Sequence, residues 1–460
     1  MVGGGHAGLT AALRLGQMPW GGEANRPEVM LVDESERFEF KPMLYQLLTG
    51  EVESWEVAPR YRDLLDGSNV TFVPGRVSGI SLPGSQTSTS GAGEGVQGRP
   101  VTDRGGSLSL EDGTQVEWDW LVLALGAETR LSGVPGAVEH AMPFTCVQDA
   151  VHLEERLALL EQNSLREGPI HVTVVGGGFS GVELAMCVKA RLGAKGSVVL
   201  LERGSDILKS GATHSREQAR NALKNAGVHV RTDTGVKQVI DGALVVTHSD
   251  AGGGGGGMAE ENLKSDVTLW TVGVQPAGGP TVLGDLPRAE NGFLHADATL
   301  QVHGHPRIFA LGDIASVPDV RAADLPARRR GDTALPRLPA TAQVAMQQAE
   351  YLCWNIWFAS RGRPLLNFRY QHLGEMMSLG PGRGSIAASP LFGGVGLDGP
   401  LAELARKAVY ALRMPTSEHR TAVGLSWLAR GLSELPGLRN RDSASPPPRG
   451  PSTREAEFKS

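Results

Sequence analysis

Cysteine is scarce in this chain of 460 residues. Its three cysteines, Cys146, Cys187 and Cys353, lie far apart and form no Cys-x-x-Cys pair. This argues against a disulfide framework, a zinc site and a dithiol relay. The 12 histidines are scattered along the chain, and we expect no metal centre.

A basic excess and a long apolar run are also missing. The chain has 44 basic and 50 acidic residues, a net charge of −6, so we expect no nucleic-acid partner. No stretch approaches the roughly 18 consecutive apolar residues of a transmembrane helix. Hydrophobic residues still make up 40% of the chain, enough for sizeable cores. The length suits two to four domains of roughly 100–200 residues each.

Glycine is abundant, with 61 residues, and part of it lies in low-complexity stretches. We interpret residues 83–107 as a flexible insert, 251–257 as a glycine linker and 436–460 as a disordered tail, because such compositions bury little apolar area. Residues 318–338 are a loop insert that contains the arginine run Arg328 to Arg330. We favour a solvated loop there over an anion-binding patch.

The informative glycines begin at the start of the chain. Gly3, Gly5 and Gly8 form a G-x-G-x-x-G motif that precedes a helical pattern, and a short apolar strand at residues 29–32 ends at Asp33. In a dinucleotide-binding fold the first glycine makes a tight turn, the second admits the pyrophosphate and the third lets helix and strand pack closely. The acid then takes the ribose hydroxyls.

A second copy of this pattern follows. A β-branched strand at residues 171–175 precedes the motif, a helix follows it, and the strand at residues 198–201 ends at Glu202, 21 residues past the last glycine. The motif glycines are Gly176, Gly178 and Gly181. Two copies in one chain predict an α/β protein with two Rossmann-like dinucleotide-binding domains. The usual reason for two such sites is a bound flavin dinucleotide that takes hydride from a nicotinamide dinucleotide.

Three further strands fit this arrangement. Apolar strands break at Gly126 and at Gly273, and we interpret both as the strands that leave the nucleotide domains. A third strand, residues 307–311, ends at Gly312 and Asp313. The Asp313 carboxylate is placed to accept hydrogen bonds from the ribityl hydroxyls of FAD; a turn or a helix cap is the alternative.

Residues 35–45, 304–313 and 374–377 extend the pattern, and with it the chain resembles the type II NAD(P)H–quinone oxidoreductases, especially their plastid C1-type branch. These are flavoproteins with a nicotinamide domain inserted in an FAD domain. The resemblance implies FAD, NAD(P)H as co-substrate, Lys41 in the cofactor site, and electron transfer without proton pumping. The implied acceptor is a quinone, plastoquinone or a demethylphylloquinone on the route to vitamin K1.

The resemblance also implies domain bounds and a location. We expect the FAD domain at residues 1–150 and 285–350, the NAD(P)H domain at 165–278, and a quinone-side region for membrane attachment at 351–435. The implied location is the chloroplast, at plastoglobules or the thylakoid surface, with the mitochondrion as the alternative.

Disulfide reductases of similar architecture carry two cysteines facing the flavin, whereas residues 40–48 here contain none. The acceptor is therefore expected to come from outside. Gln343 and Gln347 lie four apart on one face of a predicted helix. The resemblance implies that their amides face the flavin and hydrogen-bond the quinone carbonyls; an ordinary polar helix face is the alternative.

Glu183 lies two residues past Gly181, in the first turn of the second nucleotide helix. The resemblance implies a place close to nicotinamide and flavin, where it positions the cofactor or relays protons. The helix N-terminus, which stabilises a carboxylate, is by itself a sufficient structural explanation.

Residues 400–413 predict an amphipathic helix with an apolar stripe that includes Leu401, Leu404 and Leu412, with Arg406 among its basic neighbours. Residues 423–432, with Trp427, follow. Basic flanks and tryptophan suit helices lying in a membrane interface. Packing on their own domain and a homodimer interface are the alternatives.

Two features leave questions open. Only Met1 and Val2 precede Gly3, so we expect a chain truncated at its start, without its targeting peptide and with impaired flavin retention. Glu202 favours NADH, whereas Arg203 could receive the 2′-phosphate of NADPH.

Two other functions remain as rivals: a soluble reductase of a ferredoxin-like carrier or of oxygen, and a redox-sensing interaction module. The choice of quinone, the nicotinamide preference and the oligomeric state are left open.

Overall fold

The computed structural model describes most of the chain. The described residues are 1–22, 25–82, 105–163, 167–249, 258–321, 335–387 and 394–433. The glycine linker 251–257 and the predicted tail 436–460 lie outside them. So do most of the inserts 83–107 and 318–338, including the arginine run.

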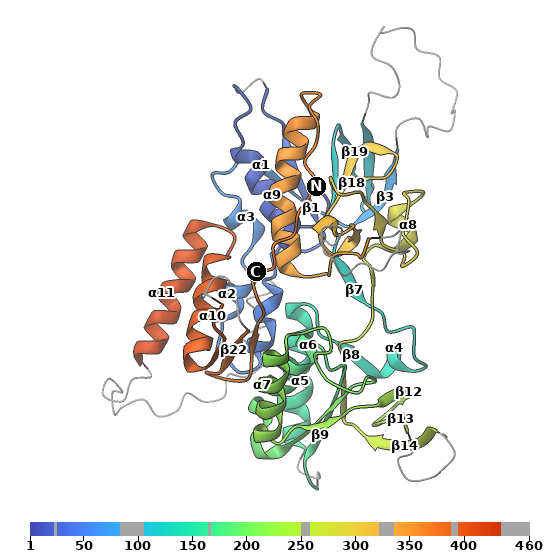
Figure 1. The fold of residues 1–460 in the computed structure, drawn as a ribbon, viewed down its shortest axis with the longest axis vertical. Coiled ribbons are helices and arrows are strands. Elements are labelled where there is room, and N and C mark those ends of the chain that lie inside the picture. The colour runs from blue at the N-terminus through green and yellow to red at the C-terminus, as the bar shows by residue number, and fades with distance from the viewer. Residues whose placement is uncertain are drawn as a thin grey trace. The chain divides into compact units, whose positions relative to one another are not determined.

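The chain folds into two compact units, each built from segments distant in sequence. Unit 1 comprises Met1–Pro42, Val57–Leu131 and Val272–Gly374. Unit 2 comprises Met43–Glu56, Ser132–Thr271 and Glu375–Ser460. Both units combine parallel strands with helices, and each holds one of the two glycine motifs (Figure 1).

The core of unit 1 is a parallel arrangement around residue Val2. Val2 forms parallel bridges to Val32 on one side and to Leu123 on the other. Only Met1 and Val2 precede the glycine motif, and the single buried residue Val2 takes the place of the strand that this fold normally has there. The flanking strands are β1 (Val29–Asp33), β2 (Val70–Pro74), β6 (Leu121–Leu123), β19 (His305–Ala310) and β18 (Gln301–Val302).

Two helices cover the first glycine motif of unit 1. Helix α1 (His6–Gln17) begins inside the motif and buries a face rich in alanine, glycine and leucine. Helix α9 (Ala342–Ala359) packs beside it, with the Thr341 hydroxyl accepting a hydrogen bond from the Val344 N–H as its N-cap (Figure 1). Small side chains on α1 allow this close packing.

The remaining elements of unit 1 are short. An antiparallel sheet is formed by β3 (Val77–Ser81), β4 (Gly106–Leu110) and β5 (Gln115–Trp118). A second antiparallel pair joins β7 (Ala127–Thr129) to β16 (Val274–Pro276). The others are α3 (Tyr61–Leu64), α8 (Gly279–Leu283), β17 (Leu294–His295), the 3-10 helix η5 (Gly312–Ile314) and β20 (Ala315–Ser316).

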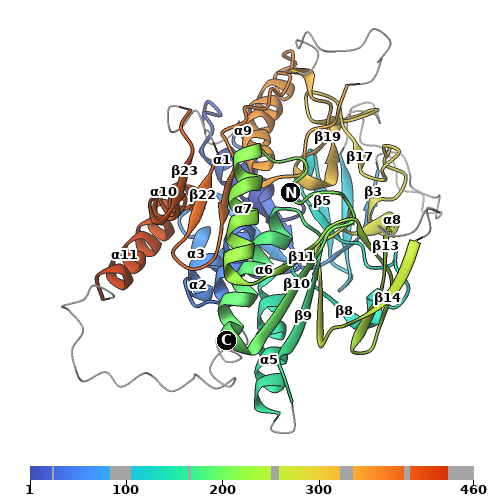
Figure 2. The same ribbon diagram turned by 60° about the horizontal axis from the view of Figure 1, so that its bottom comes forward.

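Unit 2 is built on a five-stranded parallel sheet with α6 and α7 packed against it (Figure 2). The strand order is β11 (His229–Arg231), β10 (Gly196–Leu201), β9 (Ile170–Val175), β15 (Val267–Trp270) and β8 (Ala141–Pro143). The helices are α4 (Ala137–His140), α5 (Val147–Gln162), α6 (Phe179–Leu192) and α7 (Thr213–Ala226). An antiparallel sheet follows, formed by β12 (Thr234–Ile240), β13 (Ala243–Ser249) and β14 (Met258–Lys264).

The C-terminal part of unit 2 contains a small antiparallel sheet and two helices. The sheet is formed by β21 (Met376–Ser378), β22 (Gly384–Ile386) and β23 (Leu397–Gly399), and the helices are α10 (Pro400–Leu412) and α11 (Ser417–Ser433). The 3-10 helix η2 (Lys41–Leu47) and α2 (Ser54–Val57) span the boundary between the units. Within the described ranges no helix is long and apolar enough to span a bilayer.

Glu375 of the 374–377 motif caps α7 from outside that helix. Its carboxylate accepts hydrogen bonds from the Ala212 N–H at 2.9 and 3.1 Å and from the Ser215 hydroxyl at 2.8 Å. The N-cap residue Ala212 has no side-chain acceptor of its own. Glu375 therefore satisfies helix donors that the local sequence leaves open.

The predicted fold class is confirmed. Unit 2 has a strand, the glycine motif and a helix in that order, and unit 1 has the motif and the helix with Val2 in the place of the strand. The 132–271 segment of unit 2 lies in sequence between two segments of unit 1. Both predicted C-terminal helices are present.

Candidate functional site

The three glycines of the first motif fall into two roles. Gly3 has φ +96°, and a Cβ there would lie 2.4 Å from the Ala124 carbonyl oxygen. A Cβ at Gly8 would lie 1.8 Å from the Gly3 carbonyl oxygen. Around Gly5, by contrast, no atom lies within 4 Å of the Cβ position. Gly3 and Gly8 thus permit tight packing, while Gly5 leaves space at the N-terminus of α1, where a pyrophosphate is stabilised.

Asp33 is held at the end of β1, beside this motif. Its Oδ2 accepts a hydrogen bond from the Gly4 N–H at 2.5 Å, and its Oδ1 accepts one from the Ser35 N–H at 2.8 Å. Burial raises the pKa of Asp33, and the two N–H donors and the Lys41 charge oppose that shift. The carboxylate is therefore fixed in position, with lone pairs left for a ribose.

Asp313 lies in η5, and burial raises the pKa of its carboxyl as well, again opposed by Lys41. Lys41 is exposed at the start of η2. The charge of Lys41 thus opposes the rise in pKa at both Asp33 and Asp313, which supports the assignment of Lys41 to the predicted FAD site.

Gln348 is a site residue that the sequence interpretation missed. This buried side chain accepts a hydrogen bond from the Gly312 N–H at 2.7 Å. Gly312 has φ +72°, and its Cβ position lies 3.3 Å from Ala7 Cβ and 3.7 Å from Ala345 Cβ. Gln348 therefore fixes the turn before Asp313. The sequence feature that could have pointed to Gln348 is its position directly after Gln347.

Gln343 and Gln347 both face the segment that follows α9. Gln343 donates to the Gly374 carbonyl at 2.9 Å and accepts from the Tyr370 hydroxyl at 3.0 Å. Gln347 exchanges two hydrogen bonds with the Gln371 backbone, at 2.8 and 3.0 Å. The structure thus brings the two amides together along one segment, residues 370–374, and engages both in holding it.

The second glycine motif repeats the geometry of the first. A Cβ at Gly181 would lie 1.8 Å from the Gly176 carbonyl oxygen, and Gly176 has φ +116°. Around Gly178 no atom lies within 4 Å of the Cβ position. The same division between packed and open glycines therefore recurs at the N-terminus of α6.

Glu202 repeats the role of Asp33. Its Oε2 accepts a hydrogen bond from the Gly177 N–H at 2.8 Å, and its Oε1 accepts one from the Gly204 N–H at 2.6 Å. Arg203 is exposed beside it. The anchored carboxylate at the end of β10 suits a ribose with a free 2′-hydroxyl.

Gly126 and Gly273 begin the paired strands β7 and β16. Both have φ +75°, a conformation that favours glycine. The Arg130 N–H donates to the Gly273 carbonyl at 3.1 Å, next to the β7–β16 pairing. Because the two strands are antiparallel, the two glycines lie at opposite ends of the strand pair, Gly126 next to Ala277 and Gly273 next to Arg130.

Glu183 is buried in the second turn of α6, as the fifth residue of that helix, and not in the first turn as predicted, because the helix already begins at Phe179. Its Oε1 accepts a hydrogen bond from the Ser378 N–H at 2.7 Å. Burial raises the pKa of Glu183 to about 7, while Arg406 and the Ser378 N–H oppose the shift and Glu403 adds to it. This carboxyl can therefore change its charge near neutral pH, as a general acid or base requires.

A pair of alanine variants separates packing from ligand binding in the first motif. Gly8→Ala forces its Cβ onto the Gly3 carbonyl and should lower stability by about 1–3 kcal/mol or more. Gly5→Ala has open space and φ −63°, so the apoprotein should melt as the parent does, while FAD affinity falls at least about tenfold. Thermal melting and FAD titration check both; equal destabilisation by the two variants would contradict these roles.

Glu202→Gln should shift the nicotinamide preference. Because the Glu202 carboxylate repels a 2′-phosphate, removing its charge should raise the ratio of kcat/KM for NADPH to that for NADH at least about tenfold. Glu217→Gln, at an exposed position on α7, removes a charge elsewhere in unit 2 and should leave the ratio unchanged. An unchanged ratio in Glu202→Gln would show that this carboxylate does not select the nucleotide.

Comparison with known proteins gives the same assignment. Residues 1–349 match the family described as pyridine nucleotide-disulphide oxidoreductase. The chain is 42% identical to the alternative NAD(P)H-ubiquinone oxidoreductase C1, chloroplastic/mitochondrial, of Arabidopsis thaliana, over 94% of this chain and 80% of that protein. It is 36% identical to the demethylphylloquinone reductase NdbB of Synechocystis, over 96% of this chain and 98% of that protein.

A solved structure shares the fold. The NDH2 of Plasmodium falciparum, in complex with NADH, superposes with a TM-score of 0.75 over 94% of this chain and 97% of that one, at 18% identity. From the family match and the two relatives, the chain belongs to the pyridine nucleotide-disulphide oxidoreductases and, within them, to the type II NAD(P)H–quinone oxidoreductases.

Proposed function

We propose that this protein is an FAD-dependent oxidoreductase that takes hydride from NAD(P)H and reduces a membrane quinone without pumping protons. The observation that carries the proposal is the duplicated site: a packed glycine, an open glycine and an anchored carboxylate occur in each unit. Two relatives that cover nearly the whole chain bear the names of NAD(P)H–ubiquinone and demethylphylloquinone reductases.

The residues of unit 1 fit FAD. Gly3, Gly5 and Gly8 form the pyrophosphate turn, Asp33 takes the adenosine ribose and Asp313 the ribityl chain, with Lys41 near both acids. The open Cβ position at Gly5 is the cradle into which the cofactor fits. The flavin supplies the step from two-electron hydride chemistry to quinone reduction.

The residues of unit 2 fit the nicotinamide co-substrate. Gly176, Gly178 and Gly181 receive its pyrophosphate at the N-terminus of α6, and Glu202 accepts its ribose hydroxyls. Glu183, one turn into the same helix, is our candidate for positioning the nicotinamide and holding a proton.

Gln343 and Gln347 are our candidates on the acceptor side. Both amides hold residues 370–374 against α9, so their first effect is to shape that segment. We expect the quinone headgroup to bind beside it. An acceptor from outside the chain is required, because residues 43–48 carry no cysteine that could take the electrons.

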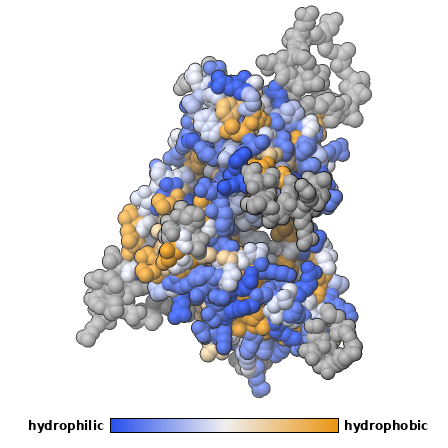
Figure 3. All heavy atoms as spheres, viewed as in Figure 1, coloured by the Kyte–Doolittle hydropathy of each residue, from blue (hydrophilic) through white to orange (hydrophobic). Residues whose placement is uncertain are grey.

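Contact with a lipid surface is proposed for the C-terminal helices. Leucines on α10 and α11 point outward, and Figure 3 shows hydrophobic side chains gathered over these helices. Leu404 and Leu412 are each 67% exposed. An apolar face of this kind, on helices that also carry arginine and tryptophan, suits the headgroup boundary of a bilayer.

The names of the relatives favour a chloroplast or mitochondrial location. Within the chloroplast, a plastoglobule or thylakoid surface would bring the enzyme to plastoquinone and demethylphylloquinone, both of which partition into lipid. The same helices could instead pair two copies of the chain.

The central reaction is tested anaerobically. FAD-loaded protein mixed with NADH or NADPH should lose its flavin absorbance, because hydride enters the flavin. A plastoquinone or naphthoquinone analogue, added after the flavin is bleached, should promptly restore the flavin absorbance. Bleaching without recovery on any quinone, but with recovery on a ferredoxin-like carrier or oxygen, would refute the quinone assignment and leave the cofactors in place.

Lipid attachment is tested with matched leucine variants. Leu404→Gln with Leu412→Gln should weaken binding to vesicles of phosphatidylcholine and phosphatidylglycerol at least about tenfold, since each buried leucine contributes roughly 1.5–3 kcal/mol. Val138→Gln with Leu159→Gln removes two side chains of similar exposure, 61% and 63%, from α4 and α5. Vesicle flotation compares the two pairs; equal losses, or none, would remove α10 from the lipid contact.

A further inference from the structure

Two polar side chains extend the hydrogen bonds of Gln343 toward the surface of unit 1. The Tyr370 hydroxyl lies 3.0 Å from Gln343 Oε1, and His372 Nδ1 lies 3.2 Å from the same hydroxyl oxygen. Gln343 and Tyr370 are half-buried, whereas His372 is exposed. The three side chains therefore form a continuous chain of hydrogen bonds from the surface to the amide that is our acceptor-side candidate.

The backbone fixes which way the Gln343 amide is turned. The Leu373 N–H, which can only donate, lies 3.1 Å from Oε1. The Gly374 carbonyl, which can only accept, lies 2.9 Å from Nε2. Exchanging the amide oxygen and nitrogen would set donor against donor and acceptor against acceptor, so only one orientation satisfies both backbone groups.

This orientation sets the direction of the other hydrogen bonds. Because Oε1 can only accept, the Tyr370 hydroxyl uses its single proton to donate to Gln343. The hydroxyl oxygen then accepts from His372, so the imidazole carries a proton on Nδ1. Every bond of the chain thus points from His372 toward Gln343.

Gln347 provides a comparison on the same helix. Its amide is oriented in the same way, by the N–H and the carbonyl of Gln371. Among the described residues, however, no side chain donates to the Gln347 oxygen, whereas the Gln343 oxygen receives two donors. Arg321 holds the added donor in place, because it donates to the Tyr370 carbonyl at 2.8 Å.

Two donors on the amide oxygen make the amide N–H of Gln343 a stronger donor. Hydrogen bonds in series polarise one another, so electron density drawn toward Oε1 leaves the hydrogens on Nε2 more positive. Gly374 takes one of these hydrogens, and the other has no hydrogen-bond partner among the residues that the structure describes. Negative charge develops on quinone oxygens as electrons arrive, and a donor fixed in advance stabilises that charge.

We propose that Tyr370 and His372 are positioning residues for quinone reduction: their hydrogen bonds hold and polarise the Gln343 amide, whose second N–H donates to a quinone carbonyl. This inference rests on the proposed function and on the acceptor-side place of Gln343. Neither Tyr370 nor His372 needs to touch the quinone. The entry of hydride into the flavin does not involve them.

The two half-reactions of the FAD-loaded enzyme separate this role from a general structural one. Tyr370→Phe keeps the ring and removes the hydroxyl, so kcat/KM for a plastoquinone analogue should fall at least about threefold, the effect of losing one hydrogen bond. The anaerobic rate of flavin reduction by NADH should stay that of the parent. Tyr351→Phe is the matched control: Tyr351 on α9 packs edge-on against Phe368, and its variant should leave both quantities unchanged.

His372 is tested by removal and rescue. His372→Ala removes the donor and should lower kcat/KM for the quinone as Tyr370→Phe does. His372→Asn places an N–H close to the position of Nδ1 and should restore most of the loss. Adding Tyr370→Phe to Gln343→Leu should lower kcat/KM no further than Gln343→Leu alone, because both changes act through one amide.

The direction of the chain is measured without quinone, by nitrogen NMR of the FAD-loaded, oxidised protein with isotope-labelled histidine. The ring signals of His372 are assigned by their loss in His372→Ala. At a pH where the ring is neutral, the nitrogen shifts should show the proton on Nδ1. Tyr370→Phe should reduce the share of that tautomer, because the acceptor for Nδ1–H is gone.

Four results would overturn the inference: a proton on Nε2 in the parent, an unchanged kcat/KM for quinone in Tyr370→Phe, slower flavin reduction in that variant, or an additive loss in the double variant. If no quinone reoxidises the parent flavin, the proposed function fails instead. The tautomer of His372 still reports in that case whether the chain of hydrogen bonds exists.

Discussion

The close approach of a helix to the turn before it is the constraint on which both cofactor sites depend. At Gly8 and at Gly181 a Cβ would lie 1.8 Å from a carbonyl oxygen, so only glycine permits the contact. That contact aims the N-termini of α1 and α6 at the open positions Gly5 and Gly178. The same distance in two units, far apart in the sequence, shows that the backbone geometry itself is duplicated.

Once the turn is fixed, the acids take their places through backbone hydrogen bonds. Asp33 and Glu202 each accept a hydrogen bond from the residue between the first two glycines of their motif, Gly4 or Gly177. Each also accepts one from the N–H of the residue two positions after the acid itself. Unit 1 has two further interactions. Gln348 accepts a hydrogen bond from the Gly312 N–H and so holds that turn, and the Lys41 charge opposes the rise in the pKa of both Asp33 and Asp313. The flavin side is therefore organised partly by interactions between residues from separate segments of the chain.

The sequence pattern predicted those features whose geometry depends on residues close together in the chain. The glycine motifs, the helices that follow them and the acids after those helices follow from spacing alone, because each set lies within one short segment of the chain. Spacing could not reveal Gln348, since its partner is 36 residues away, nor that Val2 alone would stand between Val32 and Leu123. It identified the apolar stripe of residues 400–413 and placed Arg406 among the basic neighbours of that stripe at a membrane interface, whereas the structure buries Arg406.

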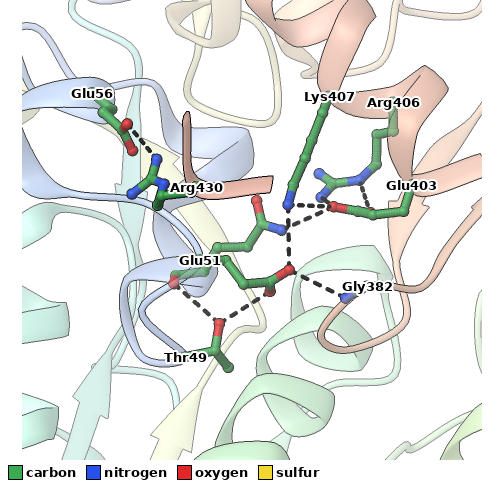
Figure 4. A network of polar contacts seen from close by, with 9 residues as sticks. Thr49, Glu51, Glu56, Gly382, Glu403, Arg406, Lys407 and Arg430 are labelled. Carbon is green, nitrogen blue, oxygen red and sulfur yellow. Dashed lines mark hydrogen bonds and ion pairs between the residues drawn. The ribbon is translucent and has the colours of Figure 1, made fainter. Parts of the chain in front are cut away.

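Arg406 is buried because the apolar stripe of α10 faces outward and its charged face is turned inward. Its leucines at 401, 404 and 412 face outward and its charges at 403 and 406 face inward, an arrangement that helical spacing allows on opposite faces. Burying charge costs several kcal/mol per ion unless it is paired, so the pairing of Arg406 and Lys407 with Glu403 is a condition for this orientation (Figure 4). If the outer face contacts lipid as proposed, the same helix presents apolar side chains to the membrane and keeps its buried charges paired with one another on the inner face.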